Sequence, residues 1–185
     1  MRDVLCGRMP GVHLNAEGER EAAQLARCLK SKVQLSSVVS SPFERAVETA
    51  EIIGREQEVA VSIDEDFGEV AFGDWTGKYF AELQGDPAWQ WYNEHRSLSR
   101  APLGESLTAV QARASRGLAD VSKRYEGGTV AVVTHGDVIR ALLVLLLGMS
   151  LDHISRLEIA PASVSELSFG PGGPVVMGVN QRFSD

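Results

Sequence analysis

Arg45, Glu69 and His135 are the side chains of this 185-residue chain whose types and positions suggest chemistry on an anion. Arg45 lies one turn into an expected helix that follows the apolar run Val38–Ser40. Free N–H groups and the dipole at a helix N-terminus attract anions, and a guanidinium beside them completes an anion site. His135 follows the β-branched run 129–133, and the glycine after it lets the backbone approach a ligand closely. An arginine after a helix start is by itself more often a solvated side chain, and a histidine after a strand is more often a packed one. The prediction of an anion site therefore depends on Arg45 and His135 lying close together.

Glu69 stands in segment 67–75, where apolar and aromatic residues flank its carboxylate. An apolar environment raises the pKa of a carboxyl group, and a raised pKa suits a general acid. The alternative interpretation of Glu69 is an exposed glutamate in a surface loop with no catalytic role. The chain contains no G-x-x-x-x-G-K-[ST] loop and no G-x-G-x-x-G loop after a strand. Gly104–Thr108 departs from the G-x-S-x-G elbow at its last position, so Ser106 is interpreted as a helix cap.

The elements that must position these residues alternate between strands and helices. Expected helices cover 15–30, 79–83, 88–94, 106–125 and 136–148. A further helix is expected from residue 44, after a capping box at Ser41-Pro42-Phe43-Glu44. Expected strands cover 38–40, 59–63, 129–133, 164–169 and 175–179, and the run 129–133 is of the kind buried on both faces. This alternation predicts an α/β sandwich with a mostly parallel sheet, whose ligand sites lie at the carboxyl ends of its strands.

Composition excludes several classes of protein. Eighteen Lys and Arg against 25 Asp and Glu give a net charge of −7, which argues against nucleic acid or an anionic membrane as the main partner. Cys6 and Cys28 form no CxxC pair and share no ligand spacing with the four histidines, so we expect no disulfide framework, no metal site and no cofactor. The apolar run 141–147 is too short to span a bilayer, and we expect no targeting segment and a cytoplasmic location.

Five motifs in order make the chain resemble the histidine phosphatase (phosphoglycerate mutase-like) superfamily. Residues 40–50, SSPFERAVETA, are similar to its SSPxxRAxxTA signature. Glu69 with the following GDWTG resembles the acid loop of the family, and Gly104-Glu105-Ser106 resembles its GES helix start. Residues 133–141, VTHGDVIRA, look like its second-histidine motif, and residues 7–22 resemble the segment just after its first motif.

The resemblance implies a three-layer α/β/α sandwich over a single domain, 1–185, with a cap region at 67–106. It also implies a hydrolase that transfers a phosphoryl group through a phosphohistidine without metal. By the same resemblance Arg45 is a phosphate clamp, His135 the second histidine that contacts the phosphate, and Glu69 the general acid; Arg8 is a weaker phosphate-binding candidate at the pocket rim. The expected substrate is a small phosphorylated metabolite, and a phosphomonoesterase is favoured over the alternative, a phosphoglycerate mutase.

The first motif of the family, Arg-His-Gly or Arg-His-Ala at the end of the first strand, is missing from this sequence. In the family that motif supplies the nucleophilic histidine, and its strand lies beside the strand that ends in the second histidine. His13, His95 and His153 are unconvincing substitutes, because one lies in an early loop and the others in polar or late helical segments.

Three explanations for the missing motif compete. An N-terminally shortened enzyme is favoured, and it predicts codons for the motif upstream of Met1. A non-catalytic module that binds phosphorylated ligands is the second. In the third, Val4–Cys6 partly fills the vacant strand position and a partner chain or domain swap completes the sheet. A homodimer is one assembly that the sequence allows. Trp75, Trp89, Trp91 and Tyr92 either shape the pocket or form part of the core, the latter being favoured.

Overall fold

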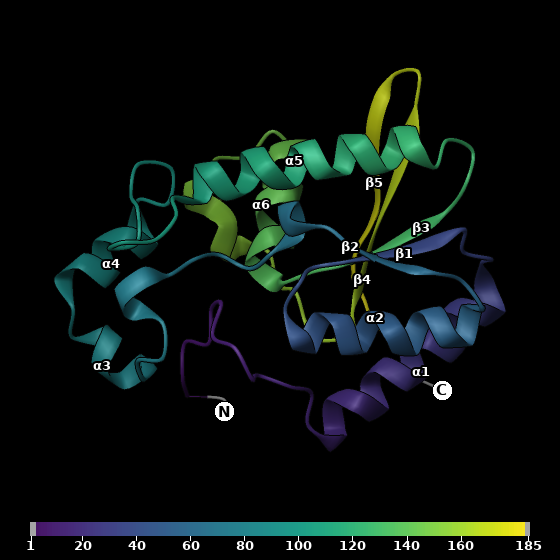
Figure 1. Cartoon of the computed structure of the whole chain (residues 1–185). Helices are drawn as coiled ribbons and strands as arrows, with labels where there is room; N and C mark the ends of the chain where they lie inside the picture. The colour runs from purple at the N-terminus through teal and green to yellow at the C-terminus, as the bar shows by residue number, and fades with distance from the viewer. Residues whose placement is uncertain (1–2, 184–185) are drawn as a thin grey trace.

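The central sheet consists of three parallel strands in the order β2–β1–β3, seen in the computed structural model, which describes residues 3–183 (Figure 1). The strands are β1 (Ser37–Ser40), β2 (Val61–Ile63) and β3 (Val130–Val133). Val38 of β1 pairs with Val61 on one side and with Ala131 on the other. Two further strands, β4 (Val164–Gly170) and β5 (Gly173–Gln181), form a separate antiparallel hairpin. The predicted parallel sheet is therefore confirmed, with the late strands set apart from it.

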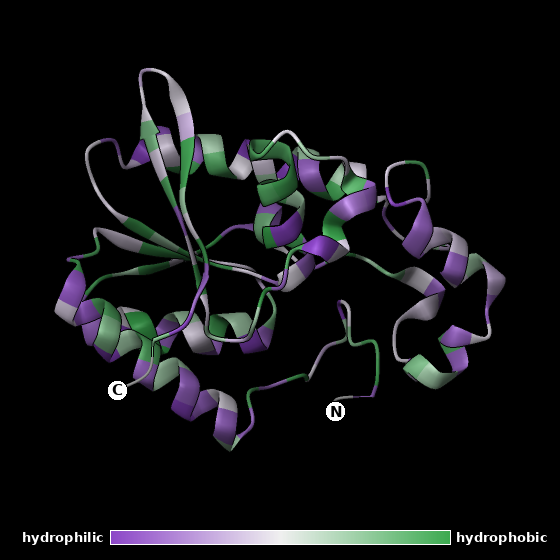
Figure 2. Cartoon of the chain, turned by 180° about the vertical axis from the view of Figure 1, so that it is seen from behind, coloured by the Kyte–Doolittle hydropathy of each residue, from purple (hydrophilic) through white to green (hydrophobic). Residues whose placement is uncertain are grey.

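Helices cover both faces of this sheet. The helices are α1 (Ala16–Lys32), α2 (Glu44–Gln57), α5 (Leu107–Arg124) and α6 (Gly136–Leu146). Ala131 and Val133 of β3 pack with the buried residues of α1 and α2, whereas Val130 and Val132 pack with those of α5. Hydrophobic and hydrophilic residues alternate along the outer helices, which are thus apolar on the side that faces the core (Figure 2). This arrangement is the predicted three-layer sandwich.

Two of the helices begin with the predicted side-chain caps. Asn15 accepts a hydrogen bond from the Gly18 N–H (2.8 Å) at the start of α1. Ser106 accepts one from the Ala109 N–H (3.3 Å) at the start of α5. Each side chain satisfies a backbone donor that the first helical turn leaves free.

The capping box expected at Ser41–Glu44 is wrong. Helix α2 begins at Glu44, and Phe43 at its N-cap makes no side-chain cap bond. The Glu44 carboxylate instead accepts from the Gly11 N–H (2.8 Å), and the Ser41 hydroxyl lies 2.7 Å from His135. Both polar side chains have found partners distant in sequence, and these replace the local bonds of a capping box.

Short helical elements connect the longer ones. They are the 3₁₀ turns η1 (Glu65–Phe67), η2 (Gly73–Trp75) and η3 (Leu151–Arg156) and the helices α3 (Phe80–Gln84) and α4 (Pro87–Glu94). Trp75 and Tyr92 are buried, with ring centroids 5.2 Å apart, and Trp89 packs against both. Trp91 is 55% exposed and stacks on His95. Trp75 and Tyr92 are therefore core residues.

Strand β3 differs from β1 in burial. All four β1 residues are buried, whereas all four β3 residues are only half-buried. Within residues 3–183, β3 pairs with β1 alone, so its other edge carries no strand. The predicted strand is present but is less buried than expected, because an edge strand lacks the neighbouring strand that would cover its outer side.

The segment near the N-terminus lies away from this edge. Val4 forms an antiparallel bridge with Tyr79, and the Leu5 N–H donates to the Lys78 carbonyl (3.0 Å). The hypothesis that Val4–Cys6 partly fill the vacant position in the sheet is therefore wrong, because the backbone groups of Val4 and Leu5 pair with residues 77–79 and the Cys6 carbonyl accepts from the Met9 N–H. None of the helices in the described range combines the length and apolar character needed to cross a bilayer.

Candidate active site

Arg45 reaches the site from the first turn of α2. Its Nη2 donates to the Gly7 carbonyl oxygen (2.9 Å) and lies 3.2 Å from Nδ1 of His135. Its Nη1 is buried and makes no hydrogen bond to the described part of the chain. The guanidinium therefore keeps an unused donor beside the N-terminus of α2, where no side chain occupies the cap.

His135 connects the two strand-to-helix junctions. It follows β3, is 6% exposed, and places Nε2 2.7 Å from the Oγ of Ser41, which follows β1. The edge of its ring meets the Phe43 ring at a centroid distance of 5.7 Å. Because β1 and β3 are parallel neighbours in register, their carboxyl ends bring residues 41 and 135 together.

Glu69 approaches from the segment after η1. Its Oε2 lies 3.7 Å from Nδ1 of His135 and 4.0 Å from Nη2 of Arg45, and its side chain is 16% exposed. Its Oε1 accepts from the Val70 N–H (2.9 Å). The structure thus brings together the three residues that the sequence singled out.

The environment moves the pKa values of both titratable groups. Burial, followed by the charge of Asp137, raises the pKa of Glu69 to about 7, although the Val70 N–H, Arg45 and Arg113 oppose the shift. Burial, followed by the nearby arginines, lowers the pKa of His135 to about 3. At neutral pH the imidazole is therefore uncharged, and a large fraction of Glu69 carries a proton.

Arg8 lies at the edge of this cluster. Its Nε donates to the Glu69 carbonyl oxygen (2.7 Å), and its Nη2 pairs with the Glu105 carboxylate (2.7 Å). Its side chain is 37% exposed, which agrees with the predicted place at a rim. Its charge also contributes to lowering the pKa of His135, so the guanidinium is near enough to act on the site electrostatically.

Sequence reasoning missed Arg113. It donates to both carboxylate oxygens of Glu105 (3.1 Å each), to the Asp66 carbonyl (2.8 Å) and to the Glu69 carbonyl (3.1 Å). The signal that could have found it is its spacing on α5. Arg113 follows the buried Val110 by three residues and therefore lies toward the same inward side of the helix. Glu105 and Arg113 together hold the backbone that carries Glu69.

The remaining histidines lie outside the cluster of Arg45, Glu69 and His135. His13 is exposed and pairs with Glu48 of α2, and His95 stacks on Trp91 in the cap. His153 belongs to η3. Between residues 3 and 183 no group of three or more His, Cys, Asp or Glu side chains has a geometry suited to a metal ion.

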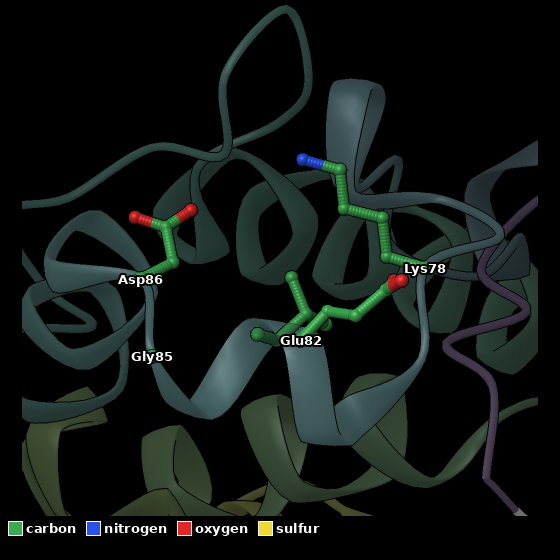
Figure 3. Close-up of a pocket in the computed structure, with 5 residues that line it drawn as sticks. Lys78, Glu82, Gly85 and Asp86 are labelled. Carbon is green, nitrogen blue, oxygen red and sulfur yellow. The ribbon is translucent and has the colours of Figure 1, made fainter.

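One surface pocket lies apart from this cluster. It is lined by Lys78, Glu82, Leu83, Gly85 and Asp86 on the outside of the cap. Figure 3 shows the side chains of Lys78 and Asp86 on opposite sides of this hollow. Because it contains none of the convergent residues and is widely open, we assign the chemistry to the cluster around His135.

Comparisons with known proteins show the family and the fold of this chain. The family model of the histidine phosphatase superfamily (branch 1) matches residues 2–182. The Mycobacterium tuberculosis protein named Bifunctional protein Rv2228c is 36% identical over 172 residues, which are 91% of this chain and 47% of that relative. This chain therefore spans about half the length of that relative.

Solved structures show the same fold. Bacillus stearothermophilus YhfR superposes with a TM-score of 0.91 at 30% identity, covering 99% of this chain and 91% of that one. The mycobacterial glucosyl-3-phosphoglycerate phosphatase Rv2419c superposes with a TM-score of 0.84 at 26% identity, covering 97% of this chain and 93% of that one. The chain belongs to the histidine phosphatase superfamily, branch 1.

Proposed function

We propose that the cluster of Arg45, Glu69 and His135 binds the phosphoryl group of a small phosphomonoester and supplies the charge and the proton donor for its metal-independent hydrolysis, but not the nucleophile. The observation that carries the proposal is the convergence of the three side chains at the carboxyl ends of β1 and β3, with separations of 3.2 to 4.0 Å. Phosphoryl transfer needs this combination of fixed positive charge and a proton donor.

Each residue has a defined role in this proposal. Arg45, the N-terminus of α2 and the more distant Arg8 compensate the negative charge of the phosphoryl oxygens. When a nucleophile forms the new bond to phosphorus from the opposite side, the bond to the leaving oxygen breaks and Glu69 donates its proton to that oxygen. A pKa of about 7 suits this step, because a large fraction of the group is protonated at neutral pH and can still release the proton.

The nucleophile is the part of the reaction for which residues 3–183 provide no histidine beside His135. The phosphohistidine route needs a histidine beside His135, and His13 and His95 are held by Glu48 and Trp91 elsewhere. We therefore propose that this chain binds phosphomonoesters and turns them over slowly or not at all. A binding module for phosphorylated ligands is the second candidate, and the same site supports it.

The proposed substrate class rests on the charge of the cluster and on the family. Its charges suit one phosphoryl group, the family resemblance points to a small phosphorylated metabolite, and the sparse cysteines favour the cytoplasm. The relative Rv2419c is named as a phosphatase of glucosyl-3-phosphoglycerate, a phosphomonoester of this kind.

Calorimetry with inorganic phosphate tests the binding site. The wild-type chain should bind phosphate, and Arg45→Ala should weaken binding by at least about a hundredfold, because the charge-assisted bonds of a guanidinium are lost from a half-buried site. Arg55→Ala is the matched control, since Arg55 is exposed in the last turn of the same helix. Equal phosphate binding by Arg45→Ala and Arg55→Ala would contradict the assignment.

Hydrolysis of p-nitrophenyl phosphate in the presence of EDTA tests turnover. We expect a rate near the background of the buffer. Rapid turnover that His135→Ala abolishes would show that the chain supplies its own nucleophile and that the proposed impairment is wrong. Turnover that EDTA removes would overturn the metal-independent route.

A further inference from the structure

The two ring nitrogens of His135 have partners of different kinds. Nδ1 lies 3.2 Å from Nη2 of Arg45, and Nε2 lies 2.7 Å from Oγ of Ser41. A guanidinium has donors only, so Nδ1 must accept and therefore carries no proton in the neutral ring. The proton resides on Nε2 and is donated to Ser41.

Ser41 is available for this bond because it does not cap α2. Its side chain is fully buried, and its Oγ lies 3.4 Å from the Phe43 N–H, at the long limit for a hydrogen bond. Its hydroxyl therefore interacts chiefly with Nε2 of His135. Ser41 and His135 come from neighbouring parallel strands, so the sheet itself sets the distance between them.

We propose that Ser41 is a positioning residue that holds His135 as its Nε2–H tautomer, so that Nδ1 faces the anion site and takes up a proton from solvent when a phosphoryl dianion binds. This inference rests on the proposed function, because it concerns the state of His135 within that site.

The charges around the His135 ring explain why proton uptake depends on the binding of an anion. The charged groups that face it from the packed elements are Arg45 of α2, Arg8 of the early loop, Arg113 of α5 and Glu69 after η1. Asp137, in the first turn of α6, acts on Glu69. In the empty site, burial and the three arginines oppose a charged imidazole. A dianion near Nδ1 reverses that balance, since an opposite charge within about 4–6 Å favours the protonated ring.

Protonation at this atom also completes the hydrogen bonds of the ring. With Nε2–H already donating to Ser41, a new Nδ1–H replaces the bond that Nδ1 accepted from Arg45 and donates to a phosphoryl oxygen, so both donors of the imidazolium are satisfied. Arg45 Nη2 keeps its bond to the Gly7 carbonyl oxygen. Without the serine hydroxyl, Nε2–H would be a buried donor without a partner, and the charged ring would be disfavoured.

Sulfate binding measured by calorimetry in two buffers of different ionisation enthalpy counts the protons taken up. Sulfate remains a dianion throughout the range from pH 5 to 8, so it contributes no proton of its own. The measurement uses Glu69→Gln as the parent, because Glu69 titrates near neutral pH and would add to the count. We expect uptake approaching one proton per sulfate at pH 5 and a decrease toward zero as pH rises.

Ser41→Ala in this parent should bind sulfate about tenfold more weakly and take up fewer protons at each pH, because a hydrogen bond to the charged ring is lost. Ser41→Thr keeps the hydroxyl and should restore both quantities. The matched control is Ser40→Ala, which removes an equally buried hydroxyl that donates to the Ser41 carbonyl and does not contact His135. This control should behave like the parent.

The ¹⁵N NMR spectrum of His135 in the unmutated, anion-free chain tests the tautomer without any variant. We expect a protonated Nε2 and an unprotonated Nδ1. A protonated Nδ1, sulfate binding without proton uptake, or identical uptake by Ser41→Ala and the parent would each overturn the inference. If the parent binds neither sulfate nor phosphate, the proposed function fails instead, and with it the premise of this inference.

Discussion

Helices α1 and α5 begin with a side-chain cap, whereas α2 and α6, which follow the strands at the site, begin without one. Away from the site, Asn15 and Ser106 bond to the first turns of their helices. At the site, Ser41 bonds to His135 instead. The comparison shows that polar side chains at the two functional junctions serve the cluster, while helix starts elsewhere are stabilised locally.

The largest expected effect concerns the pH dependence of stability at the functional junctions. The pKa of Glu69 is raised from 4.5 to about 7, so between these values the folded state binds more protons than the unfolded state. The contribution of Glu69 to the free energy of unfolding should therefore fall as pH rises from 4.5 to 7, by about 1.4 kcal/mol per pH unit. Subtracting the unfolding free energy of Glu69→Gln from that of the wild type, measured in urea at each pH, isolates this contribution.

His135 should contribute with the opposite sign. Its pKa is lowered from 6.5 to about 3, so in that range the unfolded state binds more protons. The difference between the wild type and His135→Asn should rise with pH from about 3 to 6.5, again by about 1.4 kcal/mol per pH unit. Differences that follow the same direction for both variants would contradict the electrostatic description of the site.

A smaller effect is expected at the capped helices. Asn15→Ala and Ser106→Ala should each lower the free energy of unfolding by about 1 kcal/mol, because a backbone donor in the first turn loses its partner. Phosphate affinity should stay unchanged, since neither residue contacts the cluster. Asn15→Ser is the control, because serine also caps helices and should retain most of the stability. A loss of phosphate binding in Asn15→Ala would contradict the claim that the capped helix starts do not serve the site.

The smallest effect is expected for Gly136→Ala at the start of α6. A β-carbon there meets only the end of the Arg140 side chain, at 3.3 Å, and this flexible group can shift. The free energy of unfolding should change by less than about 0.5 kcal/mol. Gly73→Ala provides the contrast, because Gly73 has φ +52° and a β-carbon would lie 1.9 Å from the Pro102 carbonyl oxygen. Thermal unfolding of the two variants should separate them clearly, and a large loss in Gly136→Ala would show a backbone constraint at this junction.

Much of the fold was predictable because it depends on local pattern. The β-branched run at 130–133, the turn residues around 170–174 and the caps at Asn15 and Ser106 act on their own neighbours along the chain. The site residues Arg45 and His135 were predictable for a related reason. Each lies at a fixed offset after a strand, and parallel strands bring such positions to one edge.

The rest depended on partners that local pattern does not specify. The segment Ser41-Pro42-Phe43-Glu44 fits a capping box, yet both of its polar side chains bond elsewhere. Arg113 is a charged residue on an otherwise ordinary amphipathic helix, and only its carbonyl and carboxylate partners show that it supports Glu69.

The sequence by itself determined the family, the α/β order of elements and three of the residues that meet at the site, Arg45, Glu69 and His135. The tertiary structure decided what those residues do to one another. Ser41 and His135 are 94 residues apart, and the register of β1 and β3 sets their contact. The pKa values of Glu69 and His135 likewise follow from burial and from charges on several elements. Hydrogen-bond partners and local dielectric depend on distances through space, which residue types and spacing do not fix.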